Sequence, residues 1–373
     1  MKIVFICGSL EPGKDGVGDY TRRLCGELIN QGLSVGIMSY NDKHVNGVVE
    51  ENQISDGNSI PCLRIANSFS RKERYNLAKN WIEEKKPEWL SLQFVPYAFN
   101  NKGLPFGLSK ELVKIGGTSK WHIMIHELWI GMNTESPSKA KFIGYVQKNI
   151  IKKILASLKP IVINTQTELY KNQLMKLGHN ATILPLFSNI PNTTASKELN
   201  VVEGFKIPSN YMVLFGSIHT HAPIDNFIKE LKLINSNPSL SLVTIGRNGA
   251  ELKKWISICK TNNLDVVDMG EQPVEIISYV IKHAKYGIST TPIDLIQKSG
   301  AMAAMHEHSL PVICISKPWT PIGVDSVTNI KGVTNYKSGH IKKCIDNTER
   351  FNPEGISLSS IGSLFVEKLK NPK

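Results

Sequence analysis

Short apolar runs alternate with longer helical stretches along most of the chain, and this alternation constrains the fold more than any other feature. The expected strands of the first half are 2–7, 34–40, 89–95, 121–126, 160–165 and 181–186, and the expected helices are 19–32, 75–87, 141–159 and 168–178. In the second half the expected strands are 211–216, 241–246, 266–270, 286–291 and 310–315. The helices expected there are 225–236, 249–263, 274–284, 299–308 and 359–370. Such alternation predicts parallel sheets flanked by helices.

A polar stretch, 188–210, separates the two series and is rich in Pro, Asn and Thr. A length of 373 residues suits about two domains of this kind. We therefore expect a first domain at 1–190, a linker at 191–210 and a second domain at 211–354. A C-terminal helix within 355–373 is expected to pack back on the first domain. The predicted fold class is α/β, with two Rossmann-like doubly wound domains and a ligand cleft between them.

Composition narrows the function classes. The net charge is +12, which favours anionic ligands. The basic residues are spread along the chain and form no nucleic-acid-binding motif, so nucleic acid is not expected as a partner. Six cysteines lie without metal-ligand spacing and are expected to be reduced and buried. No apolar run approaches the roughly 18 residues of a membrane span, and the start MKIVFICG does not resemble a signal peptide. A cytoplasmic protein is expected.

A glycine-rich loop follows the first expected strand. It contains Gly13, Gly16 and Gly18 and leads into a helix. Glycine allows positive φ and close approach of a ligand, and free N–H groups at a helix start attract anions. The spacing matches neither the dinucleotide nor the Walker motif, so a purely structural turn remains an equal alternative. Asp19 could contact an acceptor or cap the helix.

A second helix start carries Lys298, Ser299 and Gly300, followed by small residues. Ser299 is a suitable N-cap. Lys298 adds positive charge to the positive end of a helix, which is unfavourable unless an anion lies there. The sequence therefore predicts a diphosphate at this position, with a surface lysine as the alternative.

Several stretches match one family in order and spacing. They are KDGVGDYTRRL (14–24), QFVPYAFNNKGLP (93–105), IHELW (125–129), LPLFSNIP (184–191) and KSGAMAAMHEHSLPVI (298–313). The chain resembles the two-domain GT-B glycosyltransferases, specifically the retaining family 4. It departs from many members because Ile296 and Ala304 stand where paired glutamates are usual, as in a subset with a KSG loop. GSIHTHAP (216–223) also replaces the usual Arg and Lys.

The resemblance implies roles for individual residues. Catalytic roles fall on His126 and Glu127. Donor binding falls on Gly16, Val17, Gly18, Gly216, His219, Arg247, Glu271, Gln272, Pro273, Val274, Lys298, Ser299 and Gly300, with Glu271 to Val274 lining the nucleobase pocket. Acceptor binding falls on Asp19, Tyr97 and Trp129. Three of these residues have a structural alternative: His126 could be a core histidine, Glu127 could bond backbone, and Arg247 could be a surface residue.

The implied activity is transfer of a hexose from a nucleoside-diphosphate sugar to a hydroxyl of a glycan or lipid-linked acceptor, in bacterial surface polysaccharide or glycolipid synthesis. No D-x-D motif is present, so no metal and no cofactor are expected. His306 and His308, two apart on a helix, do not share a face. Alternatives are an inactive scaffold and a nucleotide-sugar epimerase. The lysine-rich stretch 139–159 could contact an anionic membrane at its inner face, or be a solvated helix face.

Overall fold

The computed structural model describes residues 1–192, 201–202, 204–234, 240–327, 329–346, 350 and 355–372. The chain divides into two compact units. Unit 1 comprises Met1–Pro185, Pro321–Val324 and Leu358–Lys373, and unit 2 comprises Leu186–Thr320 and Asp325–Ser357. Residues 193–200 and 203 of the expected linker lie outside the described residues, as do 351–354 at the expected end of the second domain and the last two residues of the expected helix 225–236.

Unit 1 is built on a mixed sheet. Its strands are β1 (Lys2–Cys7), β2 (Ser34–Asp42), β3 (Val48–Ser55), β4 (Asn58–Ala66), β5 (Trp89–Phe94), β6 (Lys120–Ile125), β7 (Val162–Thr165) and β8 (Thr182–Ile183). They lie in the order β3-β4-β2-β1-β5-β6-β7-β8. All neighbours are parallel except β3 and β4. Strand order reverses between β1 and β5, the position at which doubly wound sheets bind ligands.

Sequence reasoning missed the β3–β4 hairpin. Its two-residue turn is Asp56 and Gly57, both with positive φ (48° and 80°), followed by pairing of Ser55 with Asn58. An Asp-Gly pair between alternating apolar and polar residues is the usual signal for such a turn. The alternation QIS before it and NSI after it was therefore a readable signal.

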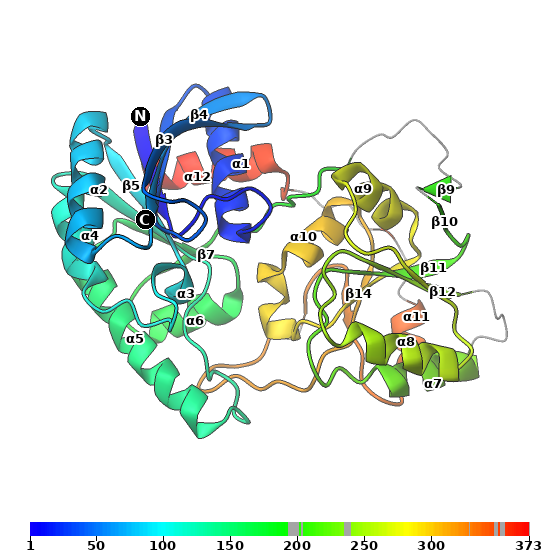
Figure 1. Ribbon diagram of the computed structural model, residues 1–373. Helices are drawn as coiled ribbons and strands as arrows, with labels where there is room; N and C mark the ends of the chain where they lie inside the picture. Colours follow the sequence, from blue (N-terminus) through cyan, green and yellow to red (C-terminus); the bar gives the residue numbers. More distant parts are fainter. Residues whose placement is uncertain are drawn as a thin grey trace. The chain divides into compact units, whose positions relative to one another are not determined.

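Seven helices accompany this sheet among the described residues. They are α1 (Gly16–Asn30), α2 (Arg71–Lys85), α3 (Pro96–Phe99), α4 (Leu108–Gly116), α5 (Ser138–Leu158), α6 (Glu168–Lys176) and α12 (Leu358–Lys370). Helix α12 lies against α1 (Figure 1). Phe365 of α12 is fully buried, with its ring centroid 5.6 Å from that of Phe5 and 5.0 Å from that of His122. The expected C-terminal helix thus forms part of unit 1.

Unit 2 contains a parallel sheet. Its strands are β11 (Tyr211–Phe215), β12 (Ser241–Ile245), β13 (Val266–Asp268), β14 (Tyr286–Ser289), β15 (Val312–Cys314) and β16 (Val333–Asn335). They lie in the order β13-β12-β11-β14-β15-β16, all parallel. A small hairpin precedes them, with β9 (Val201–Val202) and β10 (Phe205–Lys206). The order reverses between β11 and β14, which predicts the ligand position of this unit.

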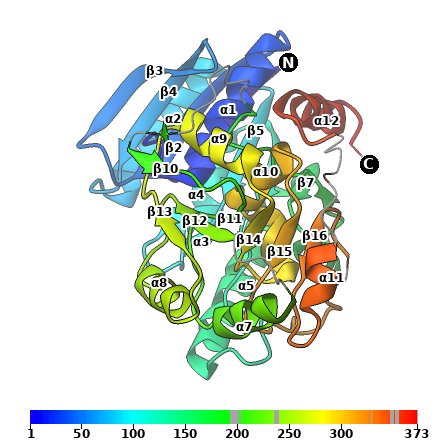
Figure 2. The same ribbon diagram turned by 90° about the vertical axis from the view of Figure 1, so that its right-hand side faces the viewer.

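Helices cover both faces of the second sheet. They are α7 (Ile224–Ile234), α8 (Leu252–Thr261), α9 (Val274–His283), the 3₁₀ helix η1 (Ile293–Lys298), α10 (Gly300–Glu307) and α11 (Ile341–Asp346). One core cluster joins the sheet to α7, α8 and α11, around the fully buried Phe227 and Trp255. The other joins it to α9 and α10, and Figure 2 shows these two groups apart. Apolar residues on both strand faces explain the near-continuous hydrophobic runs of the sequence.

Two further expectations are answered by the structure. All six cysteines are buried and free, as predicted. Among the described residues, no helix is both long and apolar enough to cross a bilayer.

Candidate functional site

The loop after β1 lies at the switch point of unit 1 and has a defined conformation. Asp15 caps α1, because its Oδ1 accepts a hydrogen bond of 2.8 Å from the Gly18 amide. The helix therefore begins at Gly16, three residues earlier than expected. The alternative that Asp19 caps it is wrong. Instead the Asp19 carboxylate accepts from the Gly13 amide at 3.1 Å and pairs with Arg22.

Buried charges anchor this loop from behind. Asp42, at the end of β2, accepts from the Leu10 amide and from the Ser9 hydroxyl, each at 3.2 Å. Arg64 donates to Asp42 at 2.9 Å. Burial raises the pKa of Asp42, but the hydrogen bonds and charge of Arg64 outweigh this and hold it below the usual value. Arg22 donates to the Leu10 carbonyl at 3.0 Å. The loop is thus held by specific hydrogen bonds and ion pairs.

The three glycines of the loop have different reasons to be glycine. Gly13 has a positive φ of 69°, whereas Gly16 and Gly18 do not. A side chain on Gly18 would meet the Ser9 carbonyl oxygen at 2.6 Å, so close packing of α1 on the loop requires glycine. A side chain on Gly16 would meet nothing within 4 Å. Of the predicted donor-binding glycines in unit 1, only Gly16 therefore has no internal packing reason. Val17 is half-buried beside it.

His126 follows β6 at the same edge of the sheet. It is 5% exposed, and its Nε2 lies 2.8 Å from Gln93 Oε1 while its Nδ1 lies 3.2 Å from Gln166 Nε2. The ring of Tyr20, from α1, packs edge-on against it at a centroid distance of 5.0 Å. Glu127 is half-buried, and its amide donates to the Phe94 carbonyl at 3.4 Å. The structure therefore brings His126 and α1 together.

The two predicted acceptor aromatics, Tyr97 and Trp129, have different local contacts. Tyr97 stands on α3, just after β5, and is 42% exposed. Trp129 lies in the loop after β6, where Lys148 of α5 sits 5.3 Å from its ring centroid. Such a cation–π contact stabilises the loop against α5. Trp129 therefore has a structural role in holding this loop, which the sequence did not reveal.

In unit 2, three neighbouring strands each end at a left-handed glycine. Gly216, Gly246 and Gly270 follow β11, β12 and β13, with φ of 81°, 87° and 62°. The Gly216 amide donates to the Ile245 carbonyl at 3.0 Å, and the Gly246 amide donates to the Gly270 carbonyl at 2.6 Å. The strands thus present backbone without side chains at one edge. Sequence reasoning selected Gly216 and missed the other two, although each ends an apolar run.

The switch point of unit 2 places His219 near the charge of Lys298. His219, in the loop after β11, contacts Thr290 Oγ1 after β14 through both its amide (2.9 Å) and its Nδ1 (3.2 Å). Burial, and then the nearby charge of Lys298, lower the pKa of His219. A Cβ on Gly216 would touch the Cβ of Ala301 at 3.6 Å. The loop after β11 and the start of α10 therefore lie together.

The start of α10 is capped as the sequence indicated. Ser299 Oγ accepts a hydrogen bond of 3.3 Å from the Met302 amide. Gly300 is the first residue of the helix, is exposed, and has nothing within 4 Å of an added Cβ. Like Gly16 at the start of α1, it has no packing reason to be glycine. Both positions leave the helix N-terminus accessible to a ligand.

The remaining predicted donor residues lie after β12 and β13. Arg247 donates to Glu271 at 2.8 Å, and their side chains are 57% and 65% exposed. This pair is a surface ion pair. Pro273 and Val274 start α9 and are exposed. The Gln272 amide group donates to the Met269 carbonyl at 2.7 Å, so its side chain is turned inward.

Two side-chain oxygens at this edge are buried without a hydrogen-bond partner among the described residues. They are Gln272 Oε1 and Asn248 Oδ1. Asn248 is 3% exposed and donates to the Gly216 carbonyl at 2.7 Å. A buried acceptor without a donor costs about 1–3 kcal/mol. Asn248 was not predicted, and the pattern Arg-Asn-Gly after an apolar run was its only signal.

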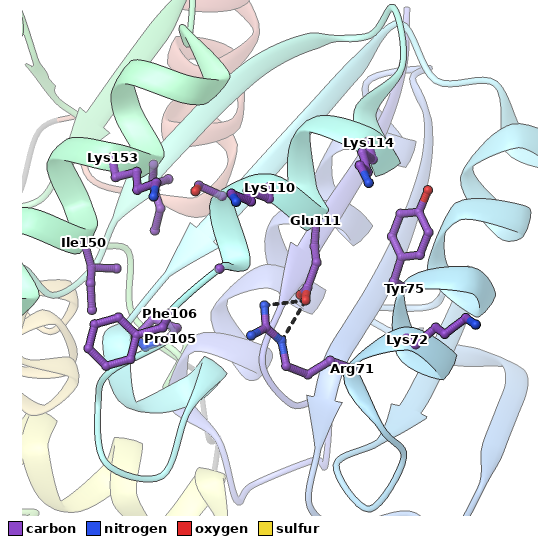
Figure 3. A pocket seen from close by; sticks show the side chains of 13 residues that line it. Arg71, Lys72, Tyr75, Pro105, Phe106, Lys110, Glu111, Lys114, Ile150 and Lys153 are labelled. Carbon is purple, nitrogen blue, oxygen red and sulfur yellow. Dashed lines mark hydrogen bonds and ion pairs between the residues drawn. The ribbon is translucent and has the colours of Figure 1, made fainter.

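A basic pocket of about 650 Å³ opens on unit 1 between α2, α4 and α5 (Figure 3). Five cationic side chains line it: Arg71, Lys72, Lys110, Lys114 and Lys153. Glu111 is its only acid and is paired with Arg71, whose Nε donates at 2.7 Å. Phe106 also lines this pocket and is exposed. On α5 itself, Phe142 and Tyr145 are also exposed.

His306 and His308 have separate surroundings. His308 Nε2 lies 2.7 Å from Ser278 Oγ, and its Nδ1 lies 2.8 Å from the Ala304 carbonyl. Burial lowers the pKa of His306 to about 4. Within the described ranges, no group of three or more His, Cys, Asp or Glu side chains is placed to hold a metal ion.

The chain is similar to known proteins in structure, but no sequence comparison finds a match. No family model matches the chain, and no curated protein matches it in sequence. HepE of Anabaena, solved with UDP and glucose, is 13% identical over 99% of both chains, with a TM-score of 0.63. The lipopolysaccharide outer core galactosyltransferase WaaB is 14% identical over 99% of both chains, with a TM-score of 0.58.

An epimerase shares the same architecture. The UDP-GlcNAc 2-epimerase of Methanocaldococcus jannaschii is 12% identical over 99% of both chains, with a TM-score of 0.52. The likeness extends over both α/β units, because each comparison covers 99% of this chain. The chain therefore has the GT-B fold, in which both glycosyltransferases and a nucleotide-sugar epimerase occur.

Proposed function

We propose that the protein is a glycosyltransferase that moves a sugar from a nucleoside-diphosphate donor to a hydroxyl acceptor. The bond between the anomeric carbon and the diphosphate oxygen breaks, and a bond to the acceptor oxygen forms. The acceptor's proton passes to the released nucleoside diphosphate or to water. Such an activity serves bacterial surface polysaccharide or glycolipid synthesis, as in the structural neighbour WaaB, a lipopolysaccharide galactosyltransferase.

The observation that carries the proposal is the cationic helix start at the switch point of unit 2. Lys298 and His219 lie together at the N-terminus of α10. An anion there gains from the helix N–H groups, the dipole and the lysine charge. A diphosphate leaving group develops negative charge during transfer, so the same groups would stabilise the transition state. This supports transfer without a metal ion.

The nucleoside is proposed to lie beside Gly246, Asn248 and Gln272. Bare backbone at the left-handed glycines allows a ring to approach closely. The unpartnered oxygens of Asn248 and Gln272 need donors, and the N–H groups of a nucleobase or hydroxyls of a ribose would supply them. Arg247 could exchange its exposed partner Glu271 for a phosphate.

In unit 1 we propose that the reacting sugar and the acceptor bind at the sheet edge formed by Gly16, His126 and Glu127. His126 is held by two glutamines, so it is oriented as a hydrogen-bonding group. Asp19, Tyr97 and Trp129 remain the proposed acceptor contacts. A retaining outcome is part of the proposal, since it rests on the resemblance to family 4.

The epimerase remains a second candidate because a nucleotide-sugar epimerase has the same fold. An epimerase inverts a carbon of the donor sugar by removing and returning a proton, and this needs acid and base groups. A non-catalytic scaffold is the third candidate. Product analysis separates the three, because only a transferase joins the sugar to an added acceptor.

A peripheral contact with anionic membrane at the inner face is proposed for the lysine-rich stretch 139–159, which forms most of α5, together with the basic pocket that α5 lines. The cations of the pocket outnumber its acids by five to one, and Phe142 and Tyr145 of α5 are 68% and 65% exposed. Basic residues beside exposed aromatics suit an anionic lipid interface. Such a position would bring the enzyme to a lipid-linked acceptor.

The proposed function is tested by product analysis in excess chelator. The protein is incubated with nucleoside-diphosphate sugars, with and without glycan or glycolipid acceptors. We expect release of nucleoside diphosphate that persists in EDTA and falls at least tenfold in Lys298→Ala. Lys232→Ala, an exposed lysine of α7, is the matched control. Activity that disappears in EDTA and returns with Mg²⁺ or Mn²⁺ would contradict the metal-independent mechanism. Absence of turnover with every donor, or an epimerised donor, would contradict the transferase.

A further inference from the structure

A continuous chain of polar side chains, all buried except the half-buried Thr182, crosses the core of unit 1. Thr182 of β8 accepts from the Asn164 amide, at 2.7 Å through Oγ1 and 3.2 Å through its carbonyl. Asn164 Oδ1 lies 3.1 Å from His122 Nε2, and His122 Nδ1 lies 2.8 Å from Ser91 Oγ. Gln93 joins the chain there, since its Nε2 donates to Ser91 Oγ at 2.7 Å. The Gln93 oxygen then meets His126 Nε2 at 2.8 Å.

One backbone carbonyl fixes the direction of every bond in this chain. The Thr182 carbonyl can only accept, so the Asn164 NH₂ group must face it and Asn164 Oδ1 must face His122. His122 Nε2 therefore carries a proton. In a neutral ring Nδ1 is then an acceptor, and it takes the hydrogen of the Ser91 hydroxyl.

The same logic continues to His126. Because the Ser91 hydroxyl donates to His122, its oxygen accepts from the Gln93 NH₂ group. The Gln93 oxygen then faces His126, whose Nε2 must carry the proton. In a neutral ring His126 Nδ1 is then the acceptor, and it faces the Gln166 NH₂ group at 3.2 Å. The tautomer of His126 is thus decided at the far end of the chain.

Neutrality of His122 is a condition for this direction. Burial lowers its pKa to about 4, more than its bond to Asn164 raises it. At neutral pH the ring therefore carries one proton, as the chain requires. The ring is also held between Phe365, edge-on, and the polar chain.

Fold stability gives no reason for such a chain. Ser91, Gln93, His122 and Asn164 are at most 1% exposed, and they lie among apolar strands. Replacing all partners of a buried hydrogen bond by apolar groups of the same shape can be nearly neutral or even stabilising. Buried networks instead specify one arrangement of their members.

We propose that Gln93 is a positioning residue for His126, and that the chain from Thr182 through Asn164, His122 and Ser91 fixes His126 as the Nε2–H tautomer. The role of His126 in sugar transfer rests on the proposed function; its tautomer does not. The consequence is that Nδ1 is the nitrogen with which His126 accepts a hydrogen bond from a substrate hydroxyl, in exchange for Gln166.

The test is the ring-nitrogen spectrum of His126 by two-bond ¹⁵N–¹H correlation NMR, assigned by the signal lost in His126→Gln. We expect the Nε2–H tautomer in the parent and a mixture of tautomers in Gln93→Leu. Asn164→Leu should also give a mixture, although the described bonds of Asn164 do not include His126. Gln93→Glu keeps an acceptor opposite Nε2 and should restore the single tautomer.

Gln173→Leu is the matched control, because this buried glutamine of unit 1 bonds to the Ile322 carbonyl and is not in the chain. It should leave the His126 signals unchanged. An Nδ1–H tautomer in the parent, or a pure Nε2–H tautomer in both leucine variants, would overturn the proposal. A leucine variant that does not fold is replaced by Ser91→Ala, which interrupts the same chain and carries the same expectation.

Kinetics supply the second readout. In Gln93→Leu we expect kcat for sugar transfer to fall at least tenfold with the donor KM within threefold, and Gln93→Glu to recover most of kcat. Equal kcat in Gln93→Leu and the parent would contradict the positioning role. If the parent transfers no sugar at all, the proposed function fails. The tautomer measurement still tests whether the hydrogen-bonded chain fixes the tautomer of His126.

Discussion

Alanine at Gly18 and alanine at Gly16 should have opposite consequences, although both residues lie in the first turn of α1. At Gly18 the new Cβ would lie 2.6 Å from the Ser9 carbonyl oxygen, a contact too short to persist. The obstacle is backbone, and it cannot rotate away as a side chain can. The loop behind it is fixed, since Asp42 binds both the Leu10 amide and the Ser9 hydroxyl.

The expected cost of Gly18→Ala follows from these contacts. Overpacking that shifts backbone costs about 1–3 kcal/mol, and the gain in helix propensity recovers at most about 1 kcal/mol. At Gly16 the Cβ meets nothing within 4 Å and the backbone is already helical. Gly16→Ala should therefore change the free energy of unfolding by less than about 0.5 kcal/mol.

The assay is thermal and urea unfolding of the parent and both variants, with sugar transfer measured on the same samples. We take the net loss as about 1–2 kcal/mol, and 1 kcal/mol corresponds to roughly 2–4 °C in Tm for a unit of about 150–250 residues, so Gly18→Ala should melt about 2–8 °C lower. Gly16→Ala should melt with the parent but lose activity, because the side chain intrudes where the proposed ligand approaches. Equal stability of Gly18→Ala and the parent would refute the packing argument, and full activity of Gly16→Ala would refute the ligand argument.

Three further predictions follow from other parts of the molecule. Burial lowers the pKa of His122 to about 4 in the folded protein. As the pH drops below about 6.5, His122 is protonated in the unfolded chain but not in the folded protein, so the free energy of unfolding falls. Between pH 7 and pH 5 this loss is about 2 kcal/mol, and urea unfolding of His122→Gln should show a smaller loss. Arg247→Ala should leave Tm unchanged, because the Arg247–Glu271 pair is exposed, but weaken nucleoside-diphosphate binding about tenfold; Lys229→Ala, which removes another exposed pair, should change neither. Removing Lys110, Lys114 and Lys153 together should weaken sedimentation with anionic liposomes about a hundredfold, at about 1 kcal/mol per lysine, whereas removing Lys232, Lys253 and Lys254 of unit 2 should have little effect.

Much of the fold could be predicted because strand and helix periodicity is strong in both halves. Buried parallel strands such as 2–7 and 241–245 appear as continuous apolar runs. The hairpin β3–β4 was missed although its Asp-Gly turn was readable, because β3 is an edge strand with polar residues such as the exposed Glu50 and the half-buried Glu51. Short elements such as α3 and β16 were missed because three or four residues carry too little periodicity.

Residues of the candidate site could be predicted where their role depends only on neighbours in the sequence. Ser299 was recognised as a cap because Ser at a helix start has a specific role. Asp19 was mistaken for the cap of α1 because the helix begins earlier, at Gly16, and Asp15 was not considered. Gln93, Asn164 and Asn248 could not be selected, since their roles depend on partners distant in sequence. Such contacts appear only when strands are placed side by side.

The central claim is that unit 2 binds a nucleoside diphosphate at the start of α10, and calorimetric titration tests it most directly. A panel of nucleoside diphosphates is titrated into the parent, Lys298→Ala and the control Lys232→Ala. The account predicts that at least one diphosphate binds the parent and the control equally. It should bind Lys298→Ala about 10- to 150-fold more weakly, corresponding to a charge-assisted bond of about 1.5–3 kcal/mol. Binding of no diphosphate to the parent, or equal affinity in all three proteins, would contradict it.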